Sequence, residues 1–442
     1  MSFDLPTLPA GWTFEPLDSC CQKGSITYGI VQPGAPVSNG VPIIRVNNFR
    51  DYRLDLTEVM NVATDVAAKY ERTRLFGGEV LLTVVGTVGQ VAVVPKNLSG
   101  YNVARAVAVI HPLPHVSADW IALCLRSPLA QHLLGSRANT TVQTTINLKD
   151  LRALPIPLPP VHERDAITAM VGALDDRITL LRETNATLES IAQALFKSWF
   201  VNFDPVRAKM EGRAPEGMDE ATAALFPDSF EETELGAVPR GWKVCSFTDA
   251  VHVIGGGTPK TSVAEYWGGE IPWFSVVDAP DGTDIYVIDT EKHITEAGLN
   301  NCSTKLLPAG TTIISARGTV GRLALVGREM AMNQSCYGLR GKAGDAYFTY
   351  FSTCRLVDGL KQRSHGSVFD TITRDTLASV SVIYPGTPTI TAFDNLVAPV
   401  MDRIRQNLEQ AQTLATLRDT LLPRLISGQL RLPVAQDELE AA

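Results

Sequence analysis

The stretch that decides the fold is VHERDAITAMVGALDDRITLLRETNATLESIAQALFKSWF, residues 161–200, which follows the proline-rich segment LPIPLPP at 154–160. Proline cannot continue a helix, so this segment predicts a long helix that begins just after it. Within the helix, a seam of positions recurs in alternating steps of four and three residues: Leu174, Ile178, Leu181, Asn185, Leu188, Ala192, Leu195 and Trp199. This spacing is typical of a coiled coil. Because so narrow an apolar stripe cannot fold alone, we expect a partner helix.

The partner helix is encoded in the same chain. The tripeptide DRI at 176–178 recurs at 402–404, 226 residues later, and the leucine pattern continues at the same offset. Two matched helices, each after a proline break, indicate a duplicated unit, and we expect the helices to pair antiparallel. The second helix is less regular, since Asn407 and Arg418 occupy seam positions. The predicted helix-pair and subunit interface consists of Leu174, Ile178, Leu181, Leu188, Leu195, Trp199, Ile404, Leu414, Leu421 and Leu425.

The segments outside the helices also repeat. Gly11-Trp12 returns as Gly241-Trp242, and the turn GTVG at 86–89 returns at 318–321 between segments rich in β-branched residues. We therefore predict an α/β (α+β) protein with a pseudo-two-fold repeat of two tandem mixed α/β domains, separated by a two-helix antiparallel coiled-coil spacer. The predicted boundaries are domain 1 at 1–160, spacer helix 1 at 161–203, an acidic linker at 204–237, domain 2 at 238–386, spacer helix 2 at 387–428 and a tail at 429–442.

Composition places the chain among ordinary globular proteins. It has 442 residues, 45% hydrophobic and 19% charged, which suggests about two to four domains. No apolar run approaches the ~18–20 residues of a membrane span, and the start lacks the layout of a signal peptide. The seven cysteines include no Cys-x-x-Cys pair, which argues against a disulfide framework or a zinc site. We expect a cytoplasmic protein that does not interact with a membrane.

The net charge of −8 is unevenly distributed. Residues 1–160 contain 13 Lys and Arg against 11 Asp and Glu, whereas residues 161–235 contain 7 against 15. The acidity therefore lies in the first helix and the linker, and the globular segments are close to neutral. Such a distribution neither indicates nor excludes binding to nucleic acid.

Signatures of catalysis are missing from the sequence. The only Pro-Pro pair, at 159–160, is followed by valine, so the Asn/Asp-Pro-Pro-aromatic segment of base methyltransferases is not found. No lysine has an acidic residue two positions before it, as common metal-dependent nucleases need, and no Gly-Lys-Ser/Thr phosphate loop occurs. The GTVG turns lie between strands, so we interpret them as structural turns rather than phosphate cradles. We expect no catalytic residue and no metal ligand.

Several polar stretches are candidates for contact with DNA. In the first domain, Arg and amide side chains can pair with base edges in the major groove, and a mixed basic and aromatic loop at 69–74 precedes a strand. In the second, the glycines of GGGTPK at 255–260 permit close approach of a backbone to phosphate. We interpret Trp267 and Trp273 as core. The candidate DNA-binding residues are Tyr28, Gln32, Arg45, Asn47, Lys69, Arg72, Arg74, Thr258, Lys260, Asn333, Gln334, Arg363, His365 and Ser367.

With these residues in view, the chain resembles the specificity subunit of a type I restriction–modification system over almost its whole length. The most specific segments are GGGTP at 255–259, EYWGGEIPW at 265–273, FKSWFVNFDP at 196–205 and LLPRLISG at 421–428, together with the paired GTVG turns. The first domain departs from this pattern because it lacks the EYWGG segment and has ITYGIVQPG at 26–34 instead. This difference suggests that the two domains recognise different sequences.

The resemblance implies a function and a set of partners. Each domain would be a target recognition domain for one half of an asymmetric, interrupted site in double-stranded DNA. The helices would set the separation of the half-sites and dock two copies of a modification (methyltransferase) subunit. Those subunits would bind S-adenosylmethionine and methylate adenine N6, and a restriction/translocase subunit would use ATP and Mg. The chain itself would bind no cofactor and catalyse no reaction.

Two other classes of function remain open on the residues alone. One is a self-contained DNA-modifying enzyme with unfamiliar motifs, and the other is a coiled-coil scaffold that does not bind DNA. The bases recognised and the spacing between half-sites cannot be predicted, since readout depends on loop geometry and on DNA shape as well as on side-chain identity.

Overall fold

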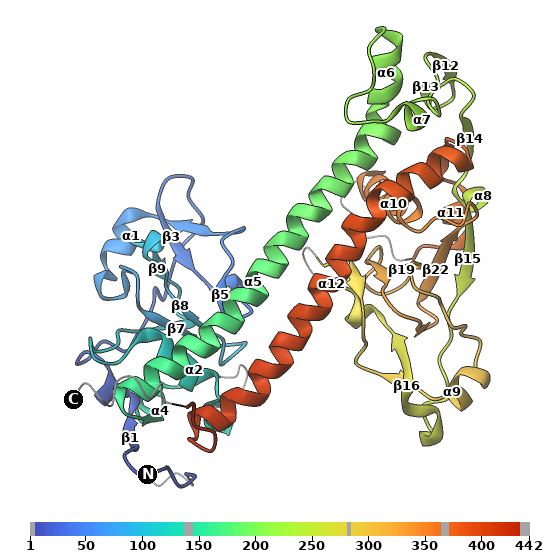
Figure 1. Ribbon diagram of the computed structural model, residues 1–442. Helices are drawn as coiled ribbons and strands as arrows, with labels where there is room; N and C mark the ends of the chain where they lie inside the picture. Colours follow the sequence, from blue (N-terminus) through green and yellow to red (C-terminus); the bar gives the residue numbers. More distant parts are fainter. Residues whose placement is uncertain (1–4, 137–144, 281–283, 364–370, 434–442) are drawn as a thin grey trace. The chain divides into compact units, whose positions relative to one another are not determined.

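The computed structural model describes residues 5–136, 145–280, 284–363 and 371–433 (Figure 1). The chain forms two compact units. Unit 1 comprises residues 1–176 and 414–442, and unit 2 comprises residues 177–413. Two long helices, α5 (Val161–Lys197) and α12 (Thr387–Ile426), each contribute one part to unit 1 and the other part to unit 2. The helical segments are thus built into the two units, whereas the predicted boundaries treated them as separate parts.

Unit 1 is a mixed α/β fold made of short strands and helices. A four-stranded sheet has the order β2-β10-β7-β8, a three-stranded sheet has the order β6-β3-β9, and β1 pairs with β11. The strands are β1 (Thr13–Pro16), β2 (Thr27–Tyr28), β3 (Val41–Ile44), β4 (Phe49–Arg50), β5 (Arg53–Leu54), β6 (Met60–Val62), β7 (Val80–Thr83), β8 (Val91–Val93), β9 (Asn102–Val103), β10 (Val107–Ile110) and β11 (Pro155–Leu158). The helices are η1 (Leu17–Cys20), η2 (Val46–Asn48), α1 (Thr64–Ala68), η3 (Glu71–Thr73), η4 (Lys96–Leu98), α2 (Ala118–Arg126), α3 (Pro128–Ser136) and α4 (Leu148–Arg152).

The core of unit 1 forms where α2 covers the four-stranded sheet. Trp120 on α2 is fully buried and donates its indole N–H to the carbonyl of Pro157 at 3.0 Å. The same hydrophobic cluster contains Ile167 and Val171 of α5 together with Leu425 of α12. The start of α5 and the end of α12 are therefore part of this core, because their apolar residues pack into it.

Unit 2 repeats the main strands of unit 1 in the same order, with additions, but among its described elements it has no counterpart of the β4–β5 pair. Its strands are β12 (Phe230–Thr233), β13 (Gly236–Pro239), β14 (Lys243–Ser246), β15 (Val251–Gly255), β16 (Trp267–Phe274), β17 (Tyr286–Val287), β18 (His293–Ile294), β19 (Thr312–Ser315), β20 (Leu323–Val326), β21 (Ala331–Met332), β22 (Cys336–Gly341) and β23 (Ser381–Tyr384). Its helices are η5 (Ser198–Asn202), α6 (Asp204–Met210), α7 (Glu220–Ala223), α8 (Phe247–Ala250), η6 (Ala264–Tyr266), η7 (Val276–Asp278), α9 (Glu296–Asn300), α10 (Tyr347–Arg363) and α11 (Arg374–Ala378).

Sheet topology shows that the two units are repeats of one fold. The order β15-β22-β19-β20 in unit 2 matches β2-β10-β7-β8 in unit 1, with β17 added at the edge. The sheet β18-β16-β21 matches β6-β3-β9, and the pair β14-β23 matches β1-β11. Even single hydrogen bonds recur, since Ile146 N–H donates to Val84 in unit 1 and Ile372 N–H donates to Ala316 in unit 2. The sequence repeat thus corresponds to a structural repeat.

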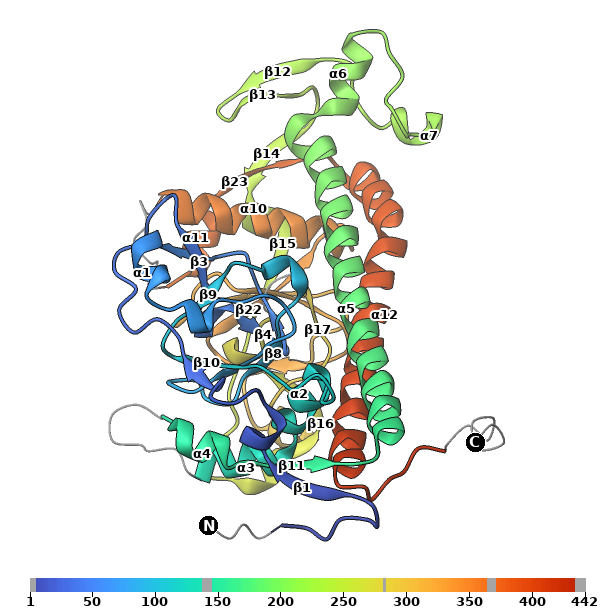
Figure 2. The same ribbon diagram turned by 90° about the vertical axis from the view of Figure 1, so that its left-hand side faces the viewer.

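The linker region is more ordered than the sequence suggests. Besides the short helix α7, it forms α6 and an antiparallel β12–β13 hairpin (Figure 2). The rings of Trp199, Phe200, Phe226 and Trp242 pack against one another with centroid separations of 5.1–6.1 Å. This aromatic cluster fixes the segment that follows α5, because each ring removes apolar surface from water.

In unit 2 the two long helices pair with opposite chain directions. Phe196 near the end of α5 packs on Phe393 near the start of α12, with ring centroids 5.7 Å apart. Farther along, the Asn185 amide donates to the carbonyl of Ile404 at 3.1 Å, and Asn407 donates to the Asn185 carbonyl oxygen at 2.9 Å. Both asparagines are buried. The predicted polar seam positions are therefore paired with one another.

In unit 1 an ion pair occupies the seam. Asp175 of α5 accepts from Arg418 of α12 at 2.8 Å and from Arg126 of α2 at 2.7 Å. The Tyr52 ring lies 3.7 Å from the Arg126 guanidinium and 5.3 Å from that of Arg418. Burial alone would raise the pKa of Asp175, but the hydrogen bonds and charges of the two arginines lower it below its ordinary value.

The ten positions predicted at the helix-pair interface differ in burial. Ile178, Leu181, Trp199, Ile404 and Leu425 are buried. The other predicted positions are half-buried: Leu174, Leu188, Leu195, Leu414 and Leu421. Among the described residues, no helix is both long and apolar enough to cross a membrane.

Replacement of Asp175 by Asn should destabilise the protein, because the substitution removes the carboxylate that Arg126 and Arg418 share and leaves Arg418 paired with Asp419 alone. We expect a loss of about 3 kcal/mol at pH 7, the lower end of the range for breaking a buried ion pair, since the Asp175 side chain is still 22% exposed. The pKa of Asp175 is lowered in the folded state, so its contribution is complete above the unfolded pKa of about 4 and fades as the pH falls below it. Chemical denaturation across this pH range measures the difference.

The neighbouring Asp176→Asn variant is a matched control. Asp176 pairs with Arg53 at 2.8 Å, but its side chain is 81% exposed. We expect an effect below about 1 kcal/mol, as for other surface ion pairs. Equal losses for the two variants would contradict a structural role for the Asp175 cluster.

Candidate nucleic-acid interface

An open groove on unit 1 brings together residues from three separate turns. Its volume is about 790 Å³, and it is lined by Arg45, Val46, Asn47, Phe49, Arg50, Asp51, Thr87, Gln90, Ala104 and Ala106. We call it the η2 groove, because the 3₁₀ turn η2 supplies its centre. Two of its members, Arg45 and Asn47, belong to the predicted DNA-binding residues. Their proximity to the GTVG turn at 86–89 is not visible in the sequence.

The η2 turn is held rigidly by a buried asparagine. Asn48 accepts a hydrogen bond from the backbone N–H of Arg45 at 2.9 Å, and its amide donates to the carbonyls of Asp55 and Glu58 at 2.9 and 3.0 Å. This arrangement satisfies the Asn48 amide inside the fold and leaves the preceding residue, Asn47, exposed. Asn47 therefore presents an amide donor and an amide acceptor to solvent from a fixed backbone.

The charged residues in the groove lining are two arginines, Arg45 and Arg50, and one aspartate, Asp51. Arg50 is exposed, and the buried Nε of Arg45 has no hydrogen-bond partner within the described part of the chain. A guanidinium has five N–H donors arranged to meet phosphate or the guanine edge. The groove thus combines two guanidinium groups with the exposed amide of Asn47. This combination suits DNA, since the guanidinium groups can bind phosphate and the amide can distinguish bases.

The GTVG turn contributes the opposite wall. Gly86 and Gly89 have φ of +80° and +94°, values that favour glycine. The N–H of Gln90 donates to the Thr83 hydroxyl at 2.9 Å, and Gln131 donates to the carbonyl of Gly89 at 2.9 Å. The prediction of a structural turn agrees with these bonds. The turn also places the exposed Thr87 in the groove, which sequence reasoning missed.

The remaining candidates of unit 1 lie outside the groove lining. Tyr28, at the end of β2, donates its hydroxyl to the carbonyl of Ile146 at 2.9 Å, and burial raises its pKa. Its hydroxyl is therefore engaged within the fold. Gln32 is exposed in the loop after β2. Three exposed basic residues follow one another from the end of α1 through η3: Lys69, Arg72 and Arg74.

In unit 2 the structure brings three candidates together from segments far apart in sequence. The Thr258 hydroxyl donates to the side-chain oxygen of Gln334. The adjacent backbones also approach closely, because a Cβ on Gly256 would lie 2.0 Å from the carbonyl oxygen of Asn333. Gly29 in unit 1 faces Val103 in the same way, with a hypothetical Cβ at 2.1 Å. At Gly256 and Gly29, glycine is required for close backbone approach, and contact of the 255–260 segment with phosphate stays a prediction.

The other candidates of unit 2 are dispersed. Lys260 is exposed, and its carbonyl accepts from the indole N–H of Trp267 at 3.4 Å. Arg363 is the last residue of α10, whereas His365 and Ser367 lie outside the described residues. Trp273 is 6% exposed and donates to the carbonyl of Gly257 at 3.0 Å, in agreement with a core role.

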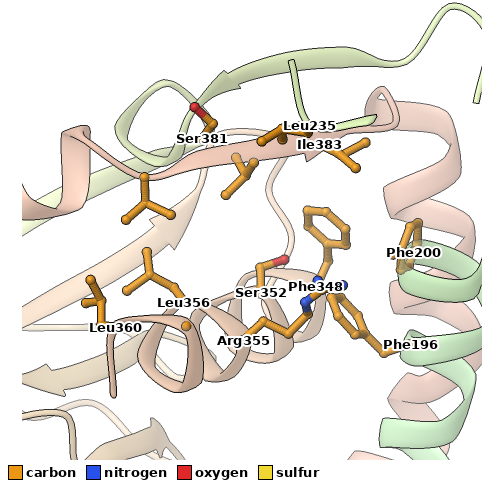
Figure 3. A pocket seen from close by; sticks show the side chains of 13 residues that line it. Phe196, Phe200, Leu235, Phe348, Ser352, Arg355, Leu356, Leu360, Ser381 and Ile383 are labelled. Atoms are coloured by element: carbon orange, nitrogen blue, oxygen red, sulfur yellow. The ribbon is translucent and has the colours of Figure 1, made fainter. Parts of the chain in front are cut away.

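A second hollow in unit 2 has a different character (Figure 3). Its volume is about 220 Å³, and its walls are mainly apolar, with Phe196, Phe348 and Leu356 among them. Arg355 extends along it toward the two phenyl rings, and burial lowers the pKa of its guanidinium (Figure 3). None of the predicted DNA-binding residues lines this hollow. Within the described residues, no group of three or more His, Cys, Asp or Glu side chains is placed to hold a metal ion.

Comparison with known proteins gives a consistent result. The family model described as "Type I restriction modification DNA specificity domain" matches residues 35–190 and again residues 239–417, which together exceed half of the chain. The HindI specificity subunit of Haemophilus influenzae is 27% identical over 389 residues, covering 77% of this chain and 84% of that protein. The MjaIX specificity subunit of Methanocaldococcus jannaschii is 35% identical over 159 residues, covering 35% and 37%.

A solved structure agrees in fold. The S subunit of a type I restriction–modification system from M. genitalium aligns with a TM-score of 0.51 at 15% identity, covering 98% of this chain and 99% of that one. At this identity the similarity concerns the fold alone.

Proposed function

The chain belongs to the type I restriction–modification DNA specificity family, and on that premise we propose that it is the non-catalytic subunit that selects the DNA sequence. The η2 groove is the observation that carries this proposal. It exposes an amide next to two arginines on a turn whose backbone is fixed by Asn48. Arginine contacts with phosphate position DNA, and amide contacts with base edges specify it.

The duplicated fold supports recognition of two different half-sites. One topology recurs in both units, so each unit presents equivalent turns to a partner. The residues at those turns differ: the positions of Thr83 and Gln90 in unit 1 correspond to Ser315 and Arg322 in unit 2, where the same backbone-to-hydroxyl bond recurs at 2.8 Å. Two units with the same backbone fold but different side chains suit an asymmetric bipartite site in double-stranded DNA.

The outer faces of the helices supply docking surfaces for two modification subunits. Ile191 of α5 and Leu417 of α12 are related by the 226-residue repeat, and each is 45% exposed. Further exposed apolar residues lie on the same helices at Val161, Leu180 and Leu396. Equivalent apolar positions, one on each unit, match two copies of one partner. Those subunits would bind S-adenosylmethionine and methylate adenine, and a restriction subunit would use ATP and Mg.

We also propose that the helix pair is a coiled-coil spacer that sets the distance between half-sites. The buried contacts of Asn185 with Asn407 and of Asp175 with Arg418 fix the helical register on both units. Because the register of the helices is fixed, the length of the helices determines the distance between the two half-sites.

Exchange of recognition units tests the main proposal. A chimera in which residues 1–150 are replaced by those of another family member should change one half of the methylated sequence and leave the other half intact. Sequencing of modified adenines after expression with the methyltransferase measures this. A change in both halves, or in neither, would count against the proposal.

Docking should depend on the two equivalent apolar residues. Ile191→Asp and Leu417→Asp should each remove one methyltransferase copy from the assembly, because each replaces an apolar contact worth roughly 2 kcal/mol with a charge. The double variant should lose both copies, as native mass spectrometry would show. The neighbouring Ser190→Asp and Thr416→Asp variants are controls that add the same charge at polar positions. They should retain both copies; equal losses in the controls would refute specific docking.

Helix length should set the gap between half-sites. Seven-residue insertions after Asp176 and after Thr413 fall between the compact units, so each unit keeps its own contacts. Seven residues preserve the seam and add ~10 Å of helix. We expect the unspecified gap to lengthen by up to about three base pairs at ~3.4 Å each. Altered half-site bases with an unchanged gap would contradict the spacer role.

A further inference from the structure

The repeat of the fold identifies the residue of unit 2 that is equivalent to Asn47. In unit 1, β3 pairs with β6 through Val41 and Val62, and in unit 2, β16 pairs with β18 through Ile271 and Ile294. The parallel partners also correspond, since Ile44 lies opposite Val103 and Phe274 lies opposite Met332. Strands β3 and β16 therefore superpose with an offset of 230 residues, while their partner strands are offset by 232 (Val62 to Ile294) and 229 (Val103 to Met332).

The turns that follow these strands correspond bond by bond. The Arg45 N–H donates to the Asn48 side chain at 2.9 Å, and the Ser275 N–H donates to the Asp278 side chain at 2.8 Å. Each turn is a 3₁₀ helix of three residues, η2 and η7. The middle residue is Asn47 in η2 and Val277 in η7.

Val277 is displayed on a rigid support. Asp278 also accepts from the Ser275 hydroxyl at 2.9 Å and from the Glu291 N–H at 2.7 Å. Arg322 anchors the following residues by donating to the carbonyls of Ala279 and Pro280 at 3.1 and 2.7 Å. Val277 is nevertheless 71% exposed, the highest value among the large exposed apolar residues of the described chain. Packing within unit 2 does not account for its identity.

The side chains of Asn47 and Val277 differ in the DNA bases that they can recognise. An amide pairs with the N6 and N7 atoms of adenine in the major groove, whereas an apolar side chain contacts the 5-methyl group of thymine. An exposed apolar residue alone would mean little. Here it occupies the position that carries Asn47, beside two arginines, in the other unit.

We propose that Val277 is a specificity-determining residue that contacts the 5-methyl group of a thymine in the half-site read by unit 2. This assignment rests on the proposed function of the chain as the sequence-reading subunit. It predicts that one thymine methyl group in that half-site is removed from water by the valine methyl groups.

Deoxyuridine substitution tests this contact atom by atom, because uracil lacks only the methyl group. The site is first mapped by sequencing methylated DNA, and each thymine of both half-sites is then replaced singly by deoxyuridine. Binding is measured with the assembled methyltransferase complex. Wild type should lose about fourfold in affinity at one position of the unit 2 half-site, the loss expected for one buried methyl group. Val277→Ala should bind thymine and uracil there equally well.

The Leu235→Ala variant is a matched control, since Leu235 is another exposed apolar residue of unit 2, 46% exposed on the β12–β13 hairpin. It should keep the wild-type sensitivity. The assignment is overturned if Val277→Ala keeps that sensitivity, if wild type tolerates uracil at every position, or if the half-site contains no thymine. These outcomes leave the proposed function standing; a complex that binds all sequences equally would overturn the proposed function itself.

Discussion

The structure depends on the buried polar contacts between two antiparallel helical segments. An apolar seam of leucine and isoleucine holds two helices together but tolerates sliding by one heptad and reversal of direction. In the observed register, Asn407 donates to the Asn185 carbonyl oxygen and Asn185 donates to the backbone carbonyl of Ile404, and another register would break both bonds. A shift would leave buried amides unpaired, at a cost of about 1–3 kcal/mol for each group.

The two copies of the repeat use this principle differently. Asp175 and Arg418 form an ion pair in unit 1, whereas the positions related to them by the 226-residue repeat in unit 2 are Met401 and Ala192, which are both fully buried. A buried ion pair is weak evidence for stability, and setting the register of packed helices is the best-attested role of buried polar groups. The polar contacts thus distinguish the helical segments of unit 1 from those of unit 2, although the apolar seams of the two units are alike.

Local patterns in the sequence were sufficient to predict the helices and the repeat. The four-and-three spacing and the proline breaks are short-range signals, and the helices begin at Val161 and Thr387 as they indicate. The GTVG turns were predictable because positive φ demands glycine at defined positions. The β12–β13 hairpin of the linker was not predictable, because its strands carry polar and acidic residues. It is held by the packing of aromatic rings from segments distant in the sequence. The start of α10 was also not predictable from local sequence. The backbone N–H groups at its start donate to the Asp394 side chain of α12, which lies 46–48 residues away in the sequence.

The candidate site was predictable only in part for the same reason. Arg45 and Asn47 were chosen for their chemistry, but the groove that contains them is completed by Arg50, Thr87 and Gln90 through tertiary structure. Tyr28 has suitable chemistry, yet its hydroxyl is used inside the fold. In unit 2, the contact of Thr258 with Gln334 joins residues 76 positions apart. The chemistry of a side chain identifies it as a candidate for DNA binding, but the topology of the fold determines which candidates lie on the same surface.

We propose that equivalent turns of the two units contact different halves of one DNA site. The most direct measurement is photocrosslinking from a photoreactive residue placed at Thr87 or, separately, at Thr319, the two exposed and equivalent positions of the GTVG turns. The assembled complex is bound to its mapped site, and the crosslinked bases are identified. We expect position 87 to crosslink within one half-site and position 319 within the other. Crosslinks from both positions to the same half-site, or to neither, would contradict it.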